Sequence, residues 1–305
     1  MAVLVILGPT ASGKSELAMQ IARQVGGEIL SVDSMQVYRG MDIGTAKPTP
    51  AERQEIRHHA IDLVNADEAF TVARFVELAD GVIQNAAARK VPLIATGGTP
   101  LYYKALFEGL FDGPGADPAL RERLRLQTNE QLHSRLAQVD PAAAARIHVP
   151  DTKRLIRALE IYELTGKPIT SFQTEWASRV VRHQATWVGL EWDREAVNRR
   201  INARVKGMMA AGWLDETRGL LERYGTLTGT GGEATGYHEL ARHLAGEMSL
   251  DNALEQIKIA TRQLARRQMK WFRRFPGVHW MPGDRSVEEN VREALERWLI
   301  PSPPD

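Results

Sequence analysis

The segment that most constrains the fold is residues 8–15, with the sequence GPTASGKS. It fits the pattern G-x-x-x-x-G-K-[ST] in full, follows the aliphatic run Val3–Leu7, and opens a helical pattern that extends to Val25. A buried strand, a glycine-rich turn and a helix in this order form a loop whose backbone N–H groups surround a phosphate. Lys14 adds a positive charge, and the Ser15 hydroxyl can bind Mg²⁺. The segment predicts an α/β fold with a phosphorylated ligand and leaves the reaction open.

Strands and helices alternate through the first part of the chain. Glu28–Asp33 and Val91–Thr96 are apolar runs typical of strands, and Val72–Ala88 between them has helical spacing. Such alternation predicts a parallel sheet with flanking helices.

The pattern changes after Gly109. From the breaker Gly113-Pro114-Gly115 to about Arg182 the spacing is helical only, and Trp187–Trp192 then resumes the strand pattern. We therefore expect a phosphate-loop core of residues 1–112 and 186–305, interrupted by an all-helical insertion of residues 113–185.

Composition excludes several classes of protein. The 39 Lys and Arg residues balance 38 Asp and Glu, so the net charge of +1 gives no overall sign of a polyanionic partner. The absence of cysteine excludes disulfides, a thiolate nucleophile and Cys-based metal sites. No apolar stretch reaches the ~18 residues of a membrane helix, and Met1–Leu7 is too short for a signal peptide. We expect a cytoplasmic protein that does not enter a membrane.

The phosphate loop by itself favours a small kinase or NTPase. Asp33 ends an apolar strand, where such enzymes hold Mg²⁺ with an aspartate. Neither an Arg-rich lid near the core nor a guanine-reading Asn-Lys-x-Asp occurs. A P-loop kinase that phosphorylates a small molecule therefore remains the alternative on the strength of the loop alone.

A longer block, Asp33–Pro48 with the sequence DSMQVYRGMDIGTAKP, is more specific. Together with residues 8–15, it resembles the tRNA dimethylallyltransferases, also called tRNA isopentenyl transferases. Four further segments extend the resemblance over nearly the whole chain: His58–Asp62, Gly97–Tyr102, Asp151–Glu160 and Thr261–Gln268. The lack of cysteine matches the bacterial type, which has no Cys/His zinc finger.

The resemblance implies that a dimethylallyl group passes from dimethylallyl diphosphate to N6 of the adenosine 3′-adjacent to the tRNA anticodon, with Mg²⁺ as cofactor. It makes Asp33 the base that accepts the N6 proton, places Thr99 and Arg204 against the diphosphate in the catalytic centre, and makes Ser15 the metal ligand. We expect a monomer. The expected diphosphate-binding residues are Gly8, Thr10, Ala11, Ser12, Gly13, Lys14 and Ser15.

Helical spacing gathers the basic residues of segment 251–275 on about half of its circumference. Such a face suits RNA phosphates, although an ordinary solvated face is the alternative. The family also implies tRNA contact near residues 153–157 and 236–238. The expected tRNA-binding residues are Asp33, Ser34, Met35, Gln36, Lys153, Arg154, Arg157, Gly236, Tyr237, His238, Arg262, Arg266, Arg267, Lys270 and Arg273.

One segment departs from the family pattern. Residues 233–238 read EATGYH, where the family has Arg-Ala-x-Gly-Tyr-Lys/Arg. Glu233 replaces the flanking arginine and His238 replaces the terminal base. We expect tRNA binding at this segment to be weaker, or more pH-dependent near the histidine pKa of ~6.5.

Overall fold

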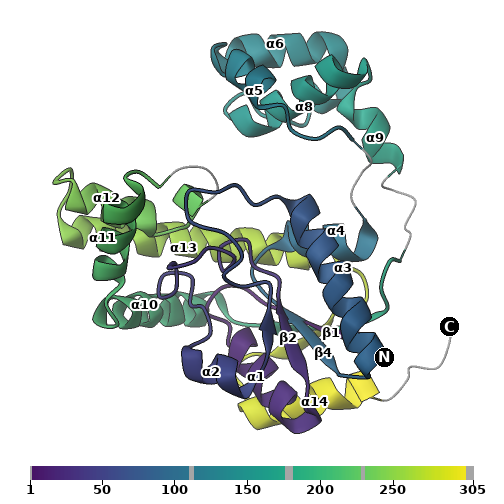
Figure 1. Ribbon diagram of the computed structural model, residues 1–305, viewed down its shortest axis with the longest axis vertical. Coiled ribbons are helices and arrows are strands. Elements are labelled where there is room, and N and C mark those ends of the chain that lie inside the picture. The colour runs from purple at the N-terminus through teal and green to yellow at the C-terminus, as the bar shows by residue number, and fades with distance from the viewer. Residues whose placement is uncertain (1, 110–112, 176–180, 228–230, 300–305) are drawn as a thin grey trace. The chain divides into compact units, whose positions relative to one another are not determined.

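The computed structural model describes residues 2–109, 113–175, 181–227 and 231–299. The chain divides into two units, one made of Met1–Phe107 and His183–Asp305 and the other of Glu108–Arg182 (Figure 1). None of the helices in the described segments is long and apolar enough to cross a membrane.

A parallel sheet forms the centre of the first unit. Its strands are β1 (Val3–Leu7), β2 (Glu28–Ser31), β3 (His58–His59), β4 (Leu93–Thr96), β5 (Ala185–Glu191) and β6 (His279–Pro282). They lie in the order β3-β2-β4-β1-β5-β6, with every pairing parallel. β1, β2 and β4 are buried along their whole length, as expected for strands covered on both faces. Their carboxyl ends meet at one edge of the sheet, where ligands bind in open α/β folds.

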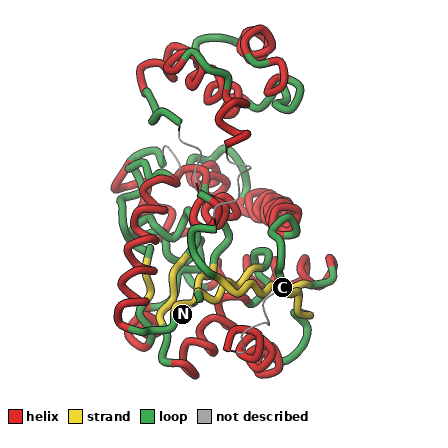
Figure 2. Tube along the Cα trace, turned by 90° about the vertical axis from the view of Figure 1, so that its right-hand side faces the viewer, coloured by secondary structure: helices red, strands yellow, loops and turns green. Residues whose placement is uncertain are grey.

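Helices cover both faces of the sheet (Figures 1 and 2). On one face, α1 (Lys14–Val25) and α14 (Val287–Leu299) pack against alternate strand residues, Val188 of β5 among them. On the other face, Trp187 meets the aromatic side chains of α4 (Pro100–Glu108). The remaining helices of this unit are α2 (Pro50–Glu55), α3 (Val72–Arg89), α10 (Arg194–Ala210), α11 (Trp213–Tyr224), the 3₁₀ turn η1 (Gly231–Glu233), α12 (Tyr237–Leu244) and α13 (Leu250–Phe272).

The regular elements described in the second unit are all helices, joined by loops (Figure 2). Leucines at helical spacing, such as Leu124, Leu132 and Leu155, form a core of its own. Its helices are α5 (Pro118–Arg125), α6 (Asn129–Val139), α7 (Pro141–Ala144), α8 (Thr152–Thr165) and α9 (Ile169–Glu175). The predicted fold class, a parallel sheet with flanking helices and an all-helical insertion, is confirmed.

A carboxylate joins the edge of the sheet to α3. Glu28 of β2 accepts two hydrogen bonds of 2.8 Å from Arg89 and pairs with His59 of β3 at 2.7 Å. The Arg89 bonds, aided by His59, hold the pKa of Glu28 down at about 2, against the raising effect of burial. The ionised carboxylate therefore stabilises the fold above pH ~4.5, and this stabilisation is lost as the pH falls toward 2.

We expect Glu28→Gln to lower the free energy of unfolding at pH 7 by about 2 kcal/mol, the scale of a charged hydrogen bond. The difference from the wild type should shrink as the pH falls from 4.5 toward 2, because the wild-type carboxylate then protonates. Urea unfolding followed by tryptophan fluorescence measures this free energy. The signal comes mainly from the unit that contains Glu28, because Trp176 is the only tryptophan of residues 108–182. Glu77→Gln, at an exposed position of α3, is the control. A pH-independent difference would contradict the assignment.

Candidate active site

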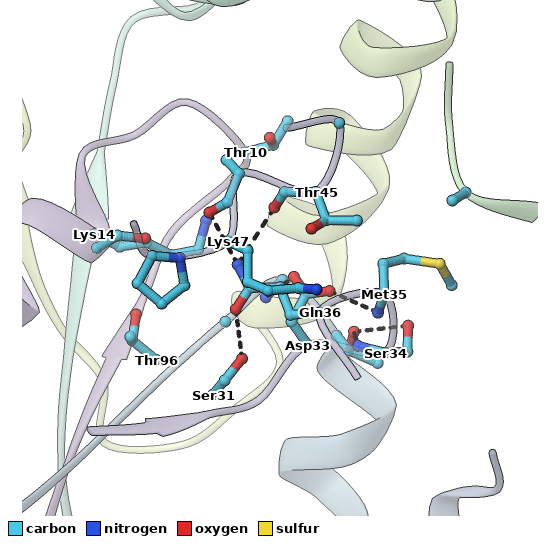
Figure 3. A pocket seen from close by; sticks show the side chains of 18 of the residues that line it. Thr10, Lys14, Ser31, Asp33, Ser34, Met35, Gln36, Thr45, Lys47 and Thr96 are labelled. Atoms are coloured by element: carbon cyan, nitrogen blue, oxygen red, sulfur yellow. Dashed lines mark hydrogen bonds between the residues drawn. The ribbon is translucent and has the colours of Figure 1, made fainter. Parts of the chain in front are cut away.

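A cavity of about 350 Å³ lies at the carboxyl ends of β1, β2 and β4 (Figure 3). Loops from these strands meet there with residues of α10 and α13. Of the residues expected to act on substrate, the cavity is lined by Thr10, Lys14, Ser15, Asp33, Ser34, Met35, Gln36, Thr99, Arg204 and Arg267.

The phosphate loop, Gly8–Ser15, turns between β1 and α1. Gly13 adopts φ 93° and precedes α1, and Ala11 is also left-handed at φ 64°. A Cβ at Gly8 would lie 2.6 Å from Ser12 Oγ, so only glycine fits there. Lys14 and Ser15 are the first residues of α1, where free N–H groups and the helix dipole favour an anion.

Two side chains hold the outside of this loop. The Trp192 indole donates to the Ser12 carbonyl at 2.9 Å, and Arg200 Nε donates to the Ala11 carbonyl at 2.6 Å. The Arg200 guanidinium also lies 4.3 Å from the Trp192 ring centroid. Because a trans peptide points its N–H opposite to its C=O, the bond to Ser12 directs the Gly13 N–H away from Trp192. The pair therefore fixes the direction of a loop amide before any anion binds.

Asp33 follows β2 and is held by backbone donors. Its Oδ1 accepts the Met35 N–H at 2.9 Å, and its Oδ2 accepts the Gly98 N–H at 3.3 Å. Thr99 Oγ1 accepts the Ser34 N–H at 2.9 Å. Hydrogen bonds of Gly98 and Thr99 thus join the loops after β2 and β4, and the carboxylate orientation is set by the main chain.

Two of the cations that line the cavity, Lys14 and Arg204, have lowered pKa values. Lys14 is buried, and burial together with nearby Arg204 lowers its pKa to about 8, opposed by Asp33. Burial also lowers the pKa of Arg204, again opposed by Asp33. No hydrogen-bond partner among the described residues contributes to the Arg204 shift. Both groups are therefore more easily kept charged when an anion enters the cavity.

The remainder of the 33–48 block is fastened to α11 and α12. Glu216 accepts the N–H groups of Asp42, Ile43 and Gly44 at 2.9, 2.7 and 3.2 Å, and the Tyr237 hydroxyl at 2.6 Å. Burial, with the Glu216 charge beside it, raises the pKa of Tyr237, which keeps its hydroxyl a donor. Glu216, which lies 174 residues after Asp42 in the chain, thus fixes one wall of the cavity.

The family model for IPP transferases matches residues 36–275. The chain belongs to this family. It is 46% identical to a tRNA dimethylallyltransferase of Anaeromyxobacter dehalogenans, with 100% of this chain and 99% of the relative covered. It is 45% identical to that of Geobacter metallireducens, with 92% of each covered. The resemblance read from the sequence is confirmed.

Solved structures agree with this membership. The chain is similar to the full-length tRNA isopentenylpyrophosphate transferase of Bacillus halodurans, with a TM-score of 0.71, 35% identity, and coverage of 96% of this chain and 93% of that chain. It is also similar to a eukaryotic dimethylallyltransferase acting on tRNA, with a TM-score of 0.81, 26% identity, and coverage of 96% and 78%.

The residues of the expected RNA-binding helix, α13, lie in different surroundings. Arg266, Arg267 and Lys270 are exposed. Arg262 is half-buried and donates to Asn202 of α10 at 2.7 Å, whereas Arg273 pairs with Glu191 at the end of β5. Of these five residues, Arg262 is therefore partly withdrawn from the surface, whereas Arg273 is exposed but already paired with an acid.

The expected tRNA-binding residues that precede α13 in the chain also differ in exposure. Gly236 and Tyr237 are buried, and a Cβ at Gly236 would lie 2.1 Å from the Trp213 ring, so both residues serve packing. His238 is exposed. The Gln36 amide accepts from Ser31 and donates to the carbonyls of Thr45 and Ala46, which shapes the loop.

In the helical unit, Lys153 and Arg154 are exposed. Arg157 instead donates to the buried carboxylate of Glu160 at 2.6 Å and to the Pro114 carbonyl at 2.8 Å. Arg121 forms two further bonds of 2.8 Å to Glu160. The Arg157 guanidinium, together with that of Arg121, therefore neutralises a buried acid within its own unit.

Sequence reasoning missed Trp192, Glu216 and Gln268. Gln268 lines the cavity from α13. No sequence signal separates Trp192 from a packing tryptophan. Gln268, in contrast, ends a family-like segment, and a glutamine among buried positions of a basic helix is a usable signal.

We expect Trp192→Phe to weaken the binding of inorganic diphosphate about fivefold, because one neutral hydrogen bond of ~1 kcal/mol no longer orients the loop. Titration calorimetry measures the affinity. Trp280→Phe, which alters a tryptophan packed on Gly189 instead, is the matched control. Unchanged affinity in Trp192→Phe would remove the role assigned to its N–H group.

Proposed function

We propose that this protein transfers a dimethylallyl group from dimethylallyl diphosphate to N6 of the adenosine 3′-adjacent to the anticodon in tRNA. The observation that carries the proposal is one cavity with a phosphate loop and the cations Lys14 and Arg204 on its walls, together with a carboxylate held by backbone amides. Relatives at 45–46% identity are named tRNA dimethylallyltransferases, which favours this activity over a P-loop kinase acting on a small molecule.

The donor diphosphate binds at the phosphate loop. Loop N–H groups, Lys14 and Arg204 stabilise the negative charge that develops as the bond between the allylic carbon and the diphosphate oxygen breaks. Thr99 contributes its hydroxyl beside them; Thr99 Oγ1 lies 3.1 Å from Ser34 Oγ. The electron pair of the broken bond leaves with the diphosphate.

Mg²⁺ fits this site through oxygen donors. A magnesium ion in such sites is held by one or two protein oxygens and by substrate phosphates, and the Ser15 hydroxyl lines the cavity at the start of α1. Within the described residues, His, Asp and Glu form no cluster of three that could hold a metal. We assign Ser15 as the protein ligand, and the ion supplies charge neutralisation for the leaving diphosphate.

Asp33 acts on the acceptor. The exocyclic amine of adenine is a weak nucleophile because its lone pair is delocalised into the ring. As N6 bonds to the allylic carbon, its proton passes to the Asp33 carboxylate, so the product is neutral at N6 and diphosphate is released. The Met35 and Gly98 N–H groups hold the carboxylate in place for this transfer.

The tRNA binds along the exposed basic side chains of α13, and its phosphates contact Arg266, Arg267 and Lys270. Ser34, Met35 and Gln36 lie near the reacting adenine. Lys153 and Arg154 provide a second basic contact from the helical unit. A monomeric state and a cytoplasmic location stay predictions from the sequence.

Incubation with dimethylallyl diphosphate, MgCl₂ and unmodified tRNA should yield N6-dimethylallyladenosine without ATP, detected by mass spectrometry of the nucleosides. Asp33→Asn should lower kcat about 10²- to 10⁴-fold, the usual contribution of a general base, with tRNA affinity unchanged. Asp67→Asn, at an exposed position, is the control. Wild-type turnover by Asp33→Asn, or a requirement for ATP, would refute the assignment.

The donor affinity should depend on pH through Lys14. Its pKa of about 8 in the free site means that the ammonium loses its proton above pH 8, while a bound diphosphate favours the charged form and raises that pKa. We expect KM for dimethylallyl diphosphate to rise by up to about tenfold per pH unit above pH 8. Lys14→Arg should show a flat profile there, because the arginine pKa exceeds 12. A flat wild-type profile to pH 9.5 would contradict this.

A further inference from the structure

Gln268 is a buried polar side chain on an otherwise amphipathic helix. It lies on α13 among the buried residues Ala265 and Phe272, is 5% exposed, and lines the cavity. Its neighbour Arg267 and the nearby Lys270 are exposed. A buried amide is stable only when both its donor and its acceptor are paired, so its partners indicate its role.

Both ends of the Gln268 amide bind the main chain of an active-site loop. Oε1 accepts the Thr10 N–H at 2.8 Å, and Nε2 donates to the Gly98 carbonyl at 2.7 Å. The Gly98 N–H in turn donates to Asp33 Oδ2 at 3.3 Å. A continuous chain of hydrogen bonds thus runs from the phosphate loop, through Gln268 and the Gly98 residue, to the Asp33 carboxylate.

The local sequence is built around this amide. A Cβ at Gly98 would lie 2.7 Å from Gln268 Nε2 and 3.1 Å from Asp33 Oδ2, so glycine admits both contacts. Only a side chain with one donor and one acceptor at this reach can satisfy Thr10 and Gly98 together. An ionised glutamate accepts from Thr10 but cannot donate to Gly98, whereas a protonated glutamate can do both.

We propose that Gln268 is a positioning residue that holds the phosphate loop and the Asp33 carboxylate in one fixed arrangement, so that the breaking bond of the donor faces the base. This inference rests on the proposed prenyl transfer and deepens it. Because α13 also carries Arg266, Arg267 and Lys270, the helix proposed to bind tRNA is the one that sets the geometry of the donor site.

The first test is the split between kcat and KM. Gln268→Met keeps the length and volume but breaks both hydrogen bonds. We expect kcat to fall about 30- to 100-fold, the scale of a small misplacement of reacting groups, while KM for tRNA stays within about twofold. Binding of inorganic diphosphate, measured by calorimetry, should weaken several-fold. Gln263→Met, at an exposed position of the same helix, should match the wild type.

The second test is a pH profile of Gln268→Glu. Protonation restores the donor to Gly98, so the ratio of its kcat to the wild-type kcat should rise about tenfold from pH 8 to pH 6, because the carboxyl is buried. The same ratio for Gln268→Met should stay flat with pH. If Gln268 had a purely structural role, the ratio for Gln268→Glu would stay flat as well.

The outcomes separate this inference from the proposed function. If the wild type prenylates tRNA but Gln268→Met behaves like Gln263→Met, the positioning role is overturned and the function stands. If the wild type forms no prenylated tRNA, the function fails, and diphosphate affinity still reports whether Gln268 orders the phosphate loop. If Gln268→Met does not fold, the pH ratio of Gln268→Glu decides, and a flat ratio overturns the proposal.

Discussion

Two chain segments leave the sheet so close together that only glycine fits between them, and the rest of the site depends on that approach. A Cβ at Gly97 would lie 2.1 Å from the Val32 carbonyl oxygen. The Val32 N–H donates to Thr96 at 2.8 Å, and the Thr99 N–H donates back to Val32 at 3.2 Å. The ladder between β2 and β4 therefore continues past the last residue of each strand. This continuation brings the Gly98 amide to Asp33 and the Thr99 hydroxyl to Ser34.

The charges around the cavity are divided between those that hold the fold and those left for a ligand. Lys47 has no exposed side-chain area and is paired with Asp42, Asp62 and the Tyr38 carbonyl. Lys14 is buried and Arg204 half-buried, and neither has a carboxylate in hydrogen-bond contact among the described residues; burial lowers the pKa of each. Placing uncompensated cations in a partly desolvated cavity is costly, and an anionic ligand offsets the cost. This division separates structural lysines from ligand-binding ones.

The strands, the phosphate loop and the position of Asp33 could be predicted from the sequence, because each depends on local pattern and on the rule that sites form at the carboxyl ends of parallel strands. Trp192, Glu216 and Gln268 could not, since each binds a loop 170 or more residues away in the chain. Arg157 has a partner that the sequence does not reveal. The family resemblance makes it an expected tRNA-binding residue, which stays a prediction, and its guanidinium pairs with buried Glu160, which no periodicity reveals.

Glu216 has a consequence for the orientation of the donor. Two stretches of consecutive backbone amides reach the cavity: the phosphate loop, and Asp42–Gly44, of which Gly44 lines it. In the second stretch, all three N–H groups are already bonded to the Glu216 carboxylate, which stands there as a built-in anion. Of these two stretches, the phosphate loop is therefore the one that keeps N–H groups for an anion, at the start of α1. If the donor binds as proposed, its diphosphate end is held at α1 and its allylic end is left for the acceptor.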